Sequence, residues 1–413
     1  MDFQTEIKRL AKEYLPEIVA IRNFLHAHPE LSFVEFETQK FVVNKISEIL
    51  RYEISISDYH NFQVKTETFK LKSIAKTGLL LEIKGNNPEK KLVALRADLD
   101  ALPITEKSDK NYCSKNVGIM HACGHDVHTA SLLGTLKILW ETKQNWEGTF
   151  RFLFQPGEEV LPGGATLMIA EGALENPIPD YIIGQHVFPE LASGKFGFRK
   201  GVYMASTDEI YITVKGKGGH GAMPHQVIDP VLIAAHILTS LQQIVSRNAK
   251  PNVPTVLSFG KVIANGATNI IPDEVKLEGT FRTMDENWRK EAHQKISNLA
   301  NQLAESMGGK CEVNIVKGYP VLENDFELTE NAKLEAINLV GANQIIDLDI
   351  RMTAEDFAWY SQKIPACFYR LGTANFEKNI TSPVHTATFD IDENALESGM
   401  AMMAWLAIND LKK

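Results

Sequence analysis

The chain has 413 residues, a formal net charge of −9 at pH 7, 44% hydrophobic residues and 23% charged residues. This length exceeds one ordinary hydrophobic core, so we expect two domains of a globular protein. The acidic balance argues against nucleic acid or an anionic membrane surface as the main partner, and no apolar stretch is long enough to span a bilayer.

The number and spacing of the cysteines indicate the redox state of the cellular compartment. Four are present at wide, irregular spacing and without a CxxC pair, namely Cys113, Cys123, Cys311 and Cys367. That spacing does not predict a disulfide framework, so a reducing compartment is expected. The first residues show no basic segment followed by an apolar run, which is the pattern of a secretory signal. We therefore expect a cytoplasmic protein.

Helices and strands alternate in the first half of the chain. Apolar residues at helical spacing predict a first helix that ends before Pro29, and a second helix is expected over residues 37–50. Short apolar runs predict buried strands over 78–83, 91–96, 150–154 and 181–184, with a helix over 129–140. This order predicts an α/β fold in which a mostly parallel sheet carries helices on both faces.

A different pattern occupies residues 201–316. Its expected elements are a strand over 209–214, a helix from Asp229-Pro230 to about Ser246, strands over 255–263 and 275–282, a helix over 286–307 and a strand over 311–316. Asp229 is the expected N-cap and Pro230 the first helical residue. The order β-α-β-β-α-β predicts an inserted ferredoxin-like α+β domain. Residues 1–200 and 317–413 then form the α/β domain, with later helices around Asp356 and Ala395.

Candidate metal ligands recur near the ends of predicted strands. They are Cys123 and His125, the adjacent pair Glu158 and Glu159, His186, and His385 near the C-terminus, with Asp98 and Asp100 after another strand. Thiolate, imidazole and carboxylate groups bind zinc and related divalent ions. Because active-site groups gather at the carboxyl ends of strands in an open α/β sheet, we expect these side chains to converge.

Each of these residues also has a simpler interpretation. The alternatives are a small buried hydrophobe for Cys123, a solvated pair for Glu158 and Glu159, loop caps for Asp98 and Asp100, an ordinary helix residue for His128 and a supporting residue for His121. The combination favours a metal site, because the polar groups recur beside glycine and proline turns. Two adjacent carboxylates suit a mechanism in which one binds metal while the other is the general base for a metal-bound water. No GxSxG elbow is present, which disfavours a serine hydrolase.

Several runs resemble the peptidase M20 family of metallohydrolases. The runs lie at residues 96–103 (RADLDALP), 121–126 (HACGHD), 155–159 (QPGEE), 218–225, 269–272 and 355–357, and at His385. The resemblance covers nearly the whole chain. It is closest to the amidohydrolase branch, which includes N-acyl-L-amino acid amidohydrolases, hippurate hydrolases and indole-acetyl-amino-acid hydrolases.

The resemblance implies two divalent metal ions per subunit, which could be zinc, manganese, cobalt or nickel. The implied ligands are Cys123, His125, Glu159, His186 and His385. Glu158 would be the general base, and Asp100 would orient a ligand. Asp98 stands where many peptidases of the family carry a metal-binding histidine. Gly157 stands where many relatives carry alanine and is expected only to loosen the backbone. After Glu159, the residues Val160-Leu161-Pro162 stand where many relatives reach a glycine sooner, and this difference in the loop could displace Glu159.

The inserted domain contains a formal GxGxxG match at residues 216–221. A Rossmann site is disfavoured because Pro224 and a helix follow instead of a second strand with an acidic end. The resemblance implies instead that this domain forms a homodimer, possibly within a tetramer. His220 would reach the partner's active site and stabilise an oxyanion, and Asn269 and Arg282 would bind the substrate carboxylate. Without the resemblance, Arg282 is better interpreted as a surface charge.

The leading hypothesis is therefore a metal-dependent amidohydrolase that cleaves N-acyl amino acids, such as N-acetyl or N-benzoyl substrates. One alternative is a peptidase of the same superfamily that acts on short peptides. Another is a thiol enzyme that uses Cys123 as its nucleophile. A third is a metal-containing binding protein without catalysis, although the presence of Glu158 argues against it.

Overall fold

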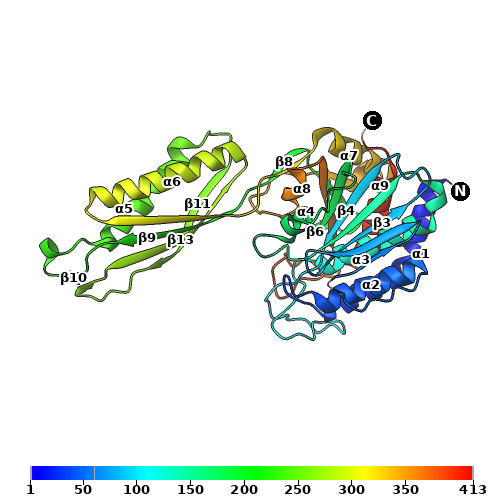
Figure 1. Cartoon of the computed structure of the whole chain (residues 1–413), viewed down its shortest axis with the longest axis horizontal. Coiled ribbons are helices and arrows are strands. Elements are labelled where there is room, and N and C mark those ends of the chain that lie inside the picture. The colour runs from blue at the N-terminus through cyan, green and yellow to red at the C-terminus, as the bar shows by residue number, and fades with distance from the viewer. Residues whose placement is uncertain (1, 60, 412–413) are drawn as a thin grey trace. The chain divides into compact units, whose positions relative to one another are not determined.

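The computed structural model of the chain describes residues 2–59 and 61–411. The chain divides into two compact units, which are coloured along the sequence in Figure 1. The first comprises Met1–Gly201, Glu323–Asp349 and Asp356–Lys413, and the second comprises Val202–Leu322 and Ile350–Glu355. Strands β8 (Gly201–Met204) and β15 (Leu322–Asn324) occur where the chain passes between the units.

The first unit contains a nine-stranded sheet with the order β1-β2-β3-β5-β4-β6-β17-β7-β16. Its strands are β1 (Gln63–Lys65), β2 (Phe69–Ile74), β3 (Gly78–Lys84), β4 (Leu92–Asp98), β5 (Thr149–Gln155), β6 (Tyr181–Ala192), β7 (Phe196–Phe198), β16 (Ile345–Asp347) and β17 (Ala366–Ala374). The central strands β5, β4, β6 and β17 are parallel, and antiparallel strands extend the sheet from β5 through β3. The predicted α/β class is confirmed.

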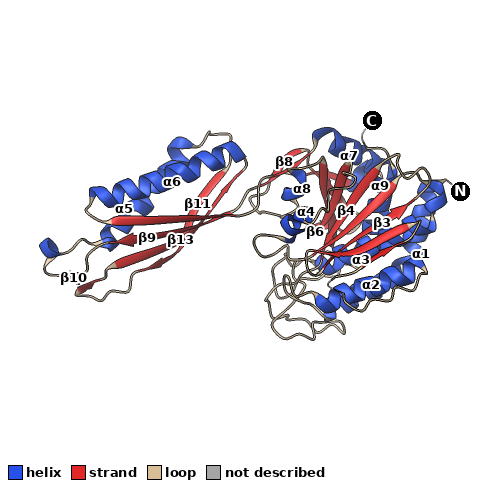
Figure 2. Ribbon diagram, viewed as in Figure 1, coloured by secondary structure: helices blue, strands red, loops and turns tan. Residues whose placement is uncertain are grey.

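Helices cover both faces of this sheet, as Figure 2 shows. One face carries α1 (Phe3–Ala27), α2 (Phe36–Leu50), α3 (His125–Glu141), α7 (Phe326–Val340) and α9 (Asn394–Ile408), and the other carries α4 (Gly164–Ala170) and α8 (Ala358–Ser361). Every residue of β4 is buried, because both of its faces are covered. Among the described helices, none has both the length and the apolar character that crossing a membrane requires.

Two differences from the predicted elements affect the site. Helix α3 begins at His125 and not near residue 129, because Gly124 adopts a left-handed φ of 83° and turns the chain into the helix. Strand β6 continues to Ala192, because β17 pairs with it beyond Gly184. His186 therefore lies within a strand and does not follow one. Helix α7 and strand β17 were not predicted.

The second unit has the predicted ferredoxin-like order. Its elements are β9 (Asp208–Lys215), α5 (Pro230–Gln243), β11 (Thr255–Ile263), β13 (Glu274–Thr283), α6 (Glu286–Ser306) and β14 (Lys310–Lys317). They form an antiparallel sheet of order β11-β13-β9-β14, against which α5 and α6 pack through one hydrophobic core. Asp229 caps α5 by accepting hydrogen bonds from two backbone N–H groups. A π-helical turn at Ile244–Asn248 extends α5.

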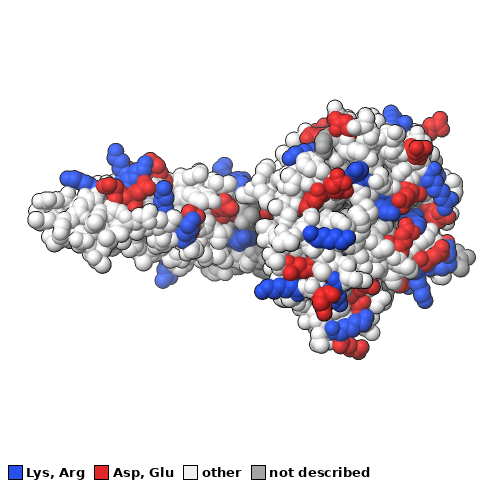
Figure 3. All heavy atoms as spheres, turned by 90° about the horizontal axis from the view of Figure 1, so that it is seen from below, with Lys and Arg blue, Asp and Glu red and all other residues white. Residues whose placement is uncertain are grey.

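Shorter elements complete the chain. Strands β10 (Gly219–His220) and β12 (Ile270–Ile271) form a small antiparallel ladder in the second unit. Single 3-10 turns lie at Lys143–Asn145, Pro224–Gln226 and Ala342–Gln344. Acidic and basic side chains are interspersed on the face drawn in Figure 3.

Candidate metal centre

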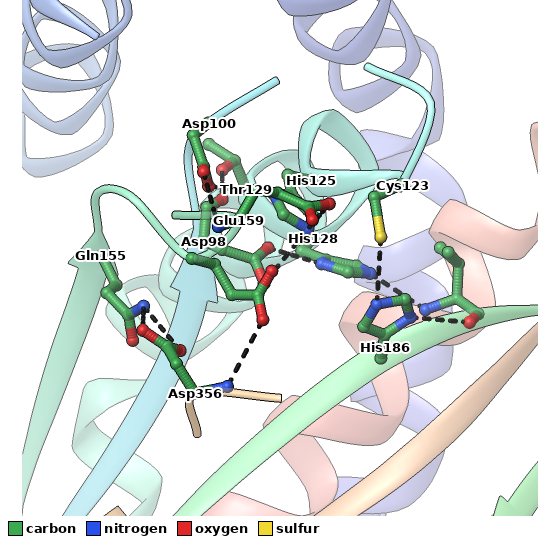
Figure 4. A network of polar contacts seen from close by, with 12 residues as sticks. Asp98, Asp100, Cys123, His125, His128, Thr129, Gln155, Glu159, His186 and Asp356 are labelled. Atoms are coloured by element: carbon green, nitrogen blue, oxygen red, sulfur yellow. Dashed lines mark hydrogen bonds and ion pairs between the residues drawn. The ribbon is translucent and has the colours of Figure 1, made fainter. Parts of the chain in front are cut away.

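Cysteine, histidine and carboxylate side chains of the first unit meet at the carboxyl end of its parallel strands (Figure 4). Cys123 Sγ lies 3.5 Å from His186 Nε2 and 3.3 Å from His385 Nε2. His385 Nε2 lies 3.3 Å from Glu159 Oε1, which is 4.0 Å from His125 Nε2. The five residues that the resemblance implied as ligands are thus neighbours, although they come from four separate stretches of the chain.

Two backbone features bring these stretches together. Gly124 has no room for a side chain, since a Cβ there would lie 2.7 Å from Val187. This close approach sets the loop that carries Cys123 against β6. His385 has a φ of 61°, in the left-handed region, and its N–H donates to the Ala122 carbonyl at 2.7 Å. The C-terminal loop is thereby attached directly beside Cys123.

The buried polar atoms of this cluster fit a bound cation. Within residues 2–59 and 61–411, the buried atoms His125 Nε2 and Glu159 Oε1 have ion-pair neighbours but form no hydrogen bond, whereas buried polar atoms are almost always hydrogen-bonded. Burial raises the pKa of the Cys123 thiol, so a positive ion is needed to hold its thiolate at neutral pH. Contacts with Cys123 and Glu159 raise the pKa of His385 to about 10, and a metal ion would replace that proton.

The ligand atoms form overlapping groups. Cys123, His125 and His186 form one, Cys123, Glu159 and His385 a second, and His125, Glu158 and Glu159 a third, with the atoms of each group within 4.8 Å of one another. These overlapping groups could hold two neighbouring ions. Soft thiolate and imidazole donors suit zinc and similar transition metals better than magnesium or calcium.

Asp100 contacts the candidate ligand His125. Its Oδ1 accepts from His125 Nδ1 at 3.1 Å, so His125 Nε2 faces the cluster, 3.6 Å from Asp98 Oδ2 and 4.0 Å from Glu159 Oε1. Asp100 Oδ2 accepts from Ser32 Oγ at 2.6 Å and from the Glu159 backbone N–H at 3.0 Å. Asp100 therefore joins the two segments that carry the candidate ligands His125 and Glu159. The hydrogen bond from Ser32 to Asp100 was not predicted, because the sequence around Ser32 does not indicate that its partner is an aspartate 68 positions away.

Glu158 is held beside the cluster by a buried network. Its Oε1 accepts from the Asp356 backbone N–H at 3.3 Å. The Asp356 carboxylate accepts from Arg96 at 2.7 Å and from Gln155 at 2.9 and 2.7 Å. Arg96 also donates to Asp98 at 2.6 Å. Asp98 is thus engaged in ion pairing, and the carboxylate of Glu158 is fixed on the same edge as Glu159.

The turn before the glutamate pair is tighter than expected. Gly157 has a φ of 56°, and a Cβ there would lie 2.4 Å from the Phe33 ring. Its N–H donates to the buried carboxylate of Glu35 at 2.8 Å. The expectation that Gly157 only loosens the backbone is wrong, because the left-handed conformation and the aromatic contact both favour glycine. Glu159 remains within the cluster despite the Val160-Leu161-Pro162 sequence.

We expect Gly157→Ala to destabilise the protein more than Gly194→Ala. Both glycines have positive φ values, but a Cβ at Gly194 would meet no atom of the described residues within 4 Å. A left-handed alanine costs about 1–2 kcal/mol, and the Phe33 overlap adds to this at Gly157. Thermal melting of the two variants measures the difference. Equal losses would show that Phe33 moves aside without cost.

The remaining predicted residues belong to the second unit. His220 and Asn269 are exposed and lie close together, since the Gly221 N–H donates to the Asn269 carbonyl at 2.9 Å beside the β10–β12 ladder. Arg282 is half-buried on β13 and donates to the Met352 carbonyl at 3.3 Å. Burial lowers the pKa of Arg282. Partial burial of its guanidinium does not fit the interpretation as an ordinary surface charge.

Residues 94–409 match the Peptidase family M20/M25/M40, so the chain belongs to this family of hydrolases. It is 42% identical over 321 residues to an N-acyl-L-amino acid amidohydrolase of Geobacillus stearothermophilus, covering 78% of this chain and 81% of that protein. It is also 36% identical to thermostable carboxypeptidase 2 of Saccharolobus solfataricus, with 99% of both chains covered. The solved structure of the Bacillus subtilis YXEP protein, a dinuclear metal binding peptidase from the M20 family, is similar with a TM-score of 0.79, 33% identity and coverage of 96% and 98%.

Proposed function

We propose that the protein is a metal-dependent amidohydrolase that cleaves the amide bond of N-acyl amino acids in the cytoplasm. The observation that carries the proposal is that the adjacent carboxylates of Glu158 and Glu159 have different surroundings. Glu159 lies in a group with the Cys123 thiol and the His385 imidazole, while Glu158 lies beside His125 and Glu159 and accepts a hydrogen bond from the Asp356 N–H. The N-acyl-L-amino acid amidohydrolase among the relatives supports this substrate class.

The chemistry follows from these roles. The two metal ions, held by Cys123, His125, Glu159, His186 and His385, would polarise the amide carbonyl and acidify water. Glu158 accepts the proton of the attacking water and returns it to the leaving amine. Burial of Glu158 strengthens its electrostatic interaction with the reacting groups, because water does not screen them there.

The metal is proposed to be zinc, with manganese, cobalt or nickel as alternatives. The combination of one cysteine with three histidines favours zinc among divalent ions. Metal analysis of the purified protein measures the identity and the number of ions per chain. Two equivalents would support the overlapping groups as a two-metal site, and one equivalent would contradict it.

A peptidase that acts on short peptides is the second candidate. It is favoured by the similarity to thermostable carboxypeptidase 2. The test is amine release from a panel of N-acetyl, N-benzoyl and N-indoleacetyl amino acids and dipeptides, with and without a chelator. Chelator-sensitive hydrolysis of the acyl amino acids supports the amidohydrolase, and preference for dipeptides supports the peptidase. Turnover that resists the chelator contradicts both.

We further propose that the second unit forms a homodimer through the β11 edge of its sheet and α5. Strand β11 lies at the end of the four-stranded sheet, and α5 exposes the apolar side chains of Val231 and Leu232. An edge strand can pair with a second copy, and exposed apolar residues would be buried beside it. In this dimer, His220 would serve the active site of the partner subunit, with Asn269 and Arg282 binding the substrate carboxylate.

We expect His220→Ala to lower kcat by about 10²- to 10³-fold, as loss of an oxyanion donor does. Metal content should not change, because His220 is outside the ligand groups. Mixing His220→Ala with Glu158→Gln subunits provides the sharper measurement. A mixed dimer contains one site with an intact Glu158 and an intact partner His220, so activity should return when the two inactive variants exchange subunits. No recovery despite exchange would mean that His220 does not act across subunits.

A further inference from the structure

His128 has a role that the sequence did not reveal. It is buried on α3, one turn after His125, and its ring is packed against two other imidazoles. The His128 ring centroid lies 4.6 Å from that of His186 and 5.4 Å from that of His125. Figure 4 shows it between Asp98 and His186. A histidine at this position could direct the orientation of its neighbours.

The hydrogen bonds of His128 fix its tautomer. Its Nε2 contacts the Val187 backbone N–H at 2.9 Å, and a backbone N–H can only donate. Nε2 is therefore unprotonated, and Nδ1 carries the proton that it donates to Asp98 Oδ1 at 2.6 Å. The other Asp98 oxygen accepts from Arg96 at 2.6 Å. The imidazole is thus fixed at both nitrogens by buried groups.

The backbone carbonyl of the same residue, Val187, fixes His186. The Val187 carbonyl contacts His186 Nδ1 at 2.8 Å, and a carbonyl can only accept. Nδ1 of His186 therefore carries its proton, and the unprotonated Nε2 faces Cys123 Sγ at 3.5 Å. Both backbone polar groups of Val187 are thus in use, in the two consecutive peptides on either side of its Cα. Its N–H is held by His128, and its carbonyl holds His186.

We propose that His128 and Asp98 are positioning residues that aim Nε2 of His186 at the metal. They act through the backbone of Val187 and through ring packing. Asp98, His125 and His128 also lie close enough together to form a ligand group, but both ring nitrogens of His128 are engaged by Asp98 and Val187, so neither His128 nor Asp98 is proposed as a ligand. Residues that support a metal-binding histidine tune its affinity, and their loss commonly lowers it about 10- to 100-fold. The inference rests on the proposed role of His186 as a ligand.

Two substitutions of His128 separate its two hydrogen bonds. In His128→Asn, the side-chain amide can donate to Asp98 but does not reach Val187. In His128→Gln, the longer side chain can accept from Val187 but gives up the Asp98 bond. Thr135→Val is the matched control, because it removes a buried hydroxyl from the same helix that donates to Ser131 and Met400 carbonyls at 2.9 and 3.2 Å.

The measurements are cobalt(II) affinity, by competition with a chromophoric chelator, and the visible spectrum of the cobalt-loaded protein. We expect His128→Asn to lower affinity about 10- to 100-fold and to change the ligand-field bands. His128→Gln should retain most of the affinity, and Thr135→Val should match the unmodified protein in both readouts. Circular dichroism establishes that each variant is folded.

Two results would overturn the inference. A wild-type spectrum and affinity in His128→Asn would show that the Val187 contact does not orient His186. Equal losses in all three variants would show a general packing effect. An unmodified protein that binds no cobalt would instead overturn the proposed metal site itself, so the two failures are distinguishable.

Discussion

Glu158→Gln is expected to abolish detectable turnover while leaving the metal content unchanged. Glutamine is isosteric, and its carbonyl oxygen can still accept from the Asp356 N–H, but it cannot take a proton from water. Loss of a general base costs about 10²- to 10⁴-fold in kcat. The measurement is amine release from the best N-acyl amino acid of the panel, together with metal analysis of the same sample.

Glu175→Gln is the control for this substitution. Glu175 is exposed and lies outside the metal groups, so kcat should not change. Mass spectrometry of the Glu158→Gln sample excludes reversion by deamidation. Near-normal activity in an intact Glu158→Gln protein would show that another group is the base. Loss of metal together with activity would mean that Glu158 is mainly a ligand.

Cys123→Ser is expected to lower metal affinity by more than about 100-fold, which exceeds the effect typical of residues that only support a ligand. Cys123 belongs to two of the ligand groups and is in contact with both His186 and His385, so its removal affects both proposed ions. Serine is close in size to cysteine, but its hydroxyl oxygen binds zinc much more weakly than the soft thiolate sulfur does. Activity should return in part when excess metal is added. Competition with a chelator measures the affinity.

The same variant tests the thiol mechanism. If Cys123 were a nucleophile, Cys123→Ser would lose activity, keep its metal and show no recovery with added ions. Cys113→Ser is the matched control, since Cys113 is half-buried, belongs to none of the ligand groups found among the described residues and donates to the Lys110 carbonyl at 2.9 Å. Its metal affinity and activity should equal those of the unmodified protein.

The sequence by itself determined the fold class and the types of ligand. Parallel strands that are covered on both faces are mostly apolar, so β4 and β5 were visible as short, predominantly apolar runs. The cap at Asp229-Pro230 is a local hydrogen-bonding pattern, and it fixed the start of α5 correctly. The motifs around Cys123 and Glu158 were recognisable because each is contiguous in the chain.

Only the tertiary structure decided how these parts become a site. Cys123 and His385 are 262 positions apart, and they meet because the loop at His385 is attached to the Ala122 carbonyl. The end of β6 could not be predicted, since it depends on pairing with β17 and on no local signal. The roles of Ser32 and His128 could not be predicted either, because they too depend on long-range contacts. Each makes its decisive hydrogen bonds to residues that are distant in sequence, and a single sequence without the fold does not specify such partners.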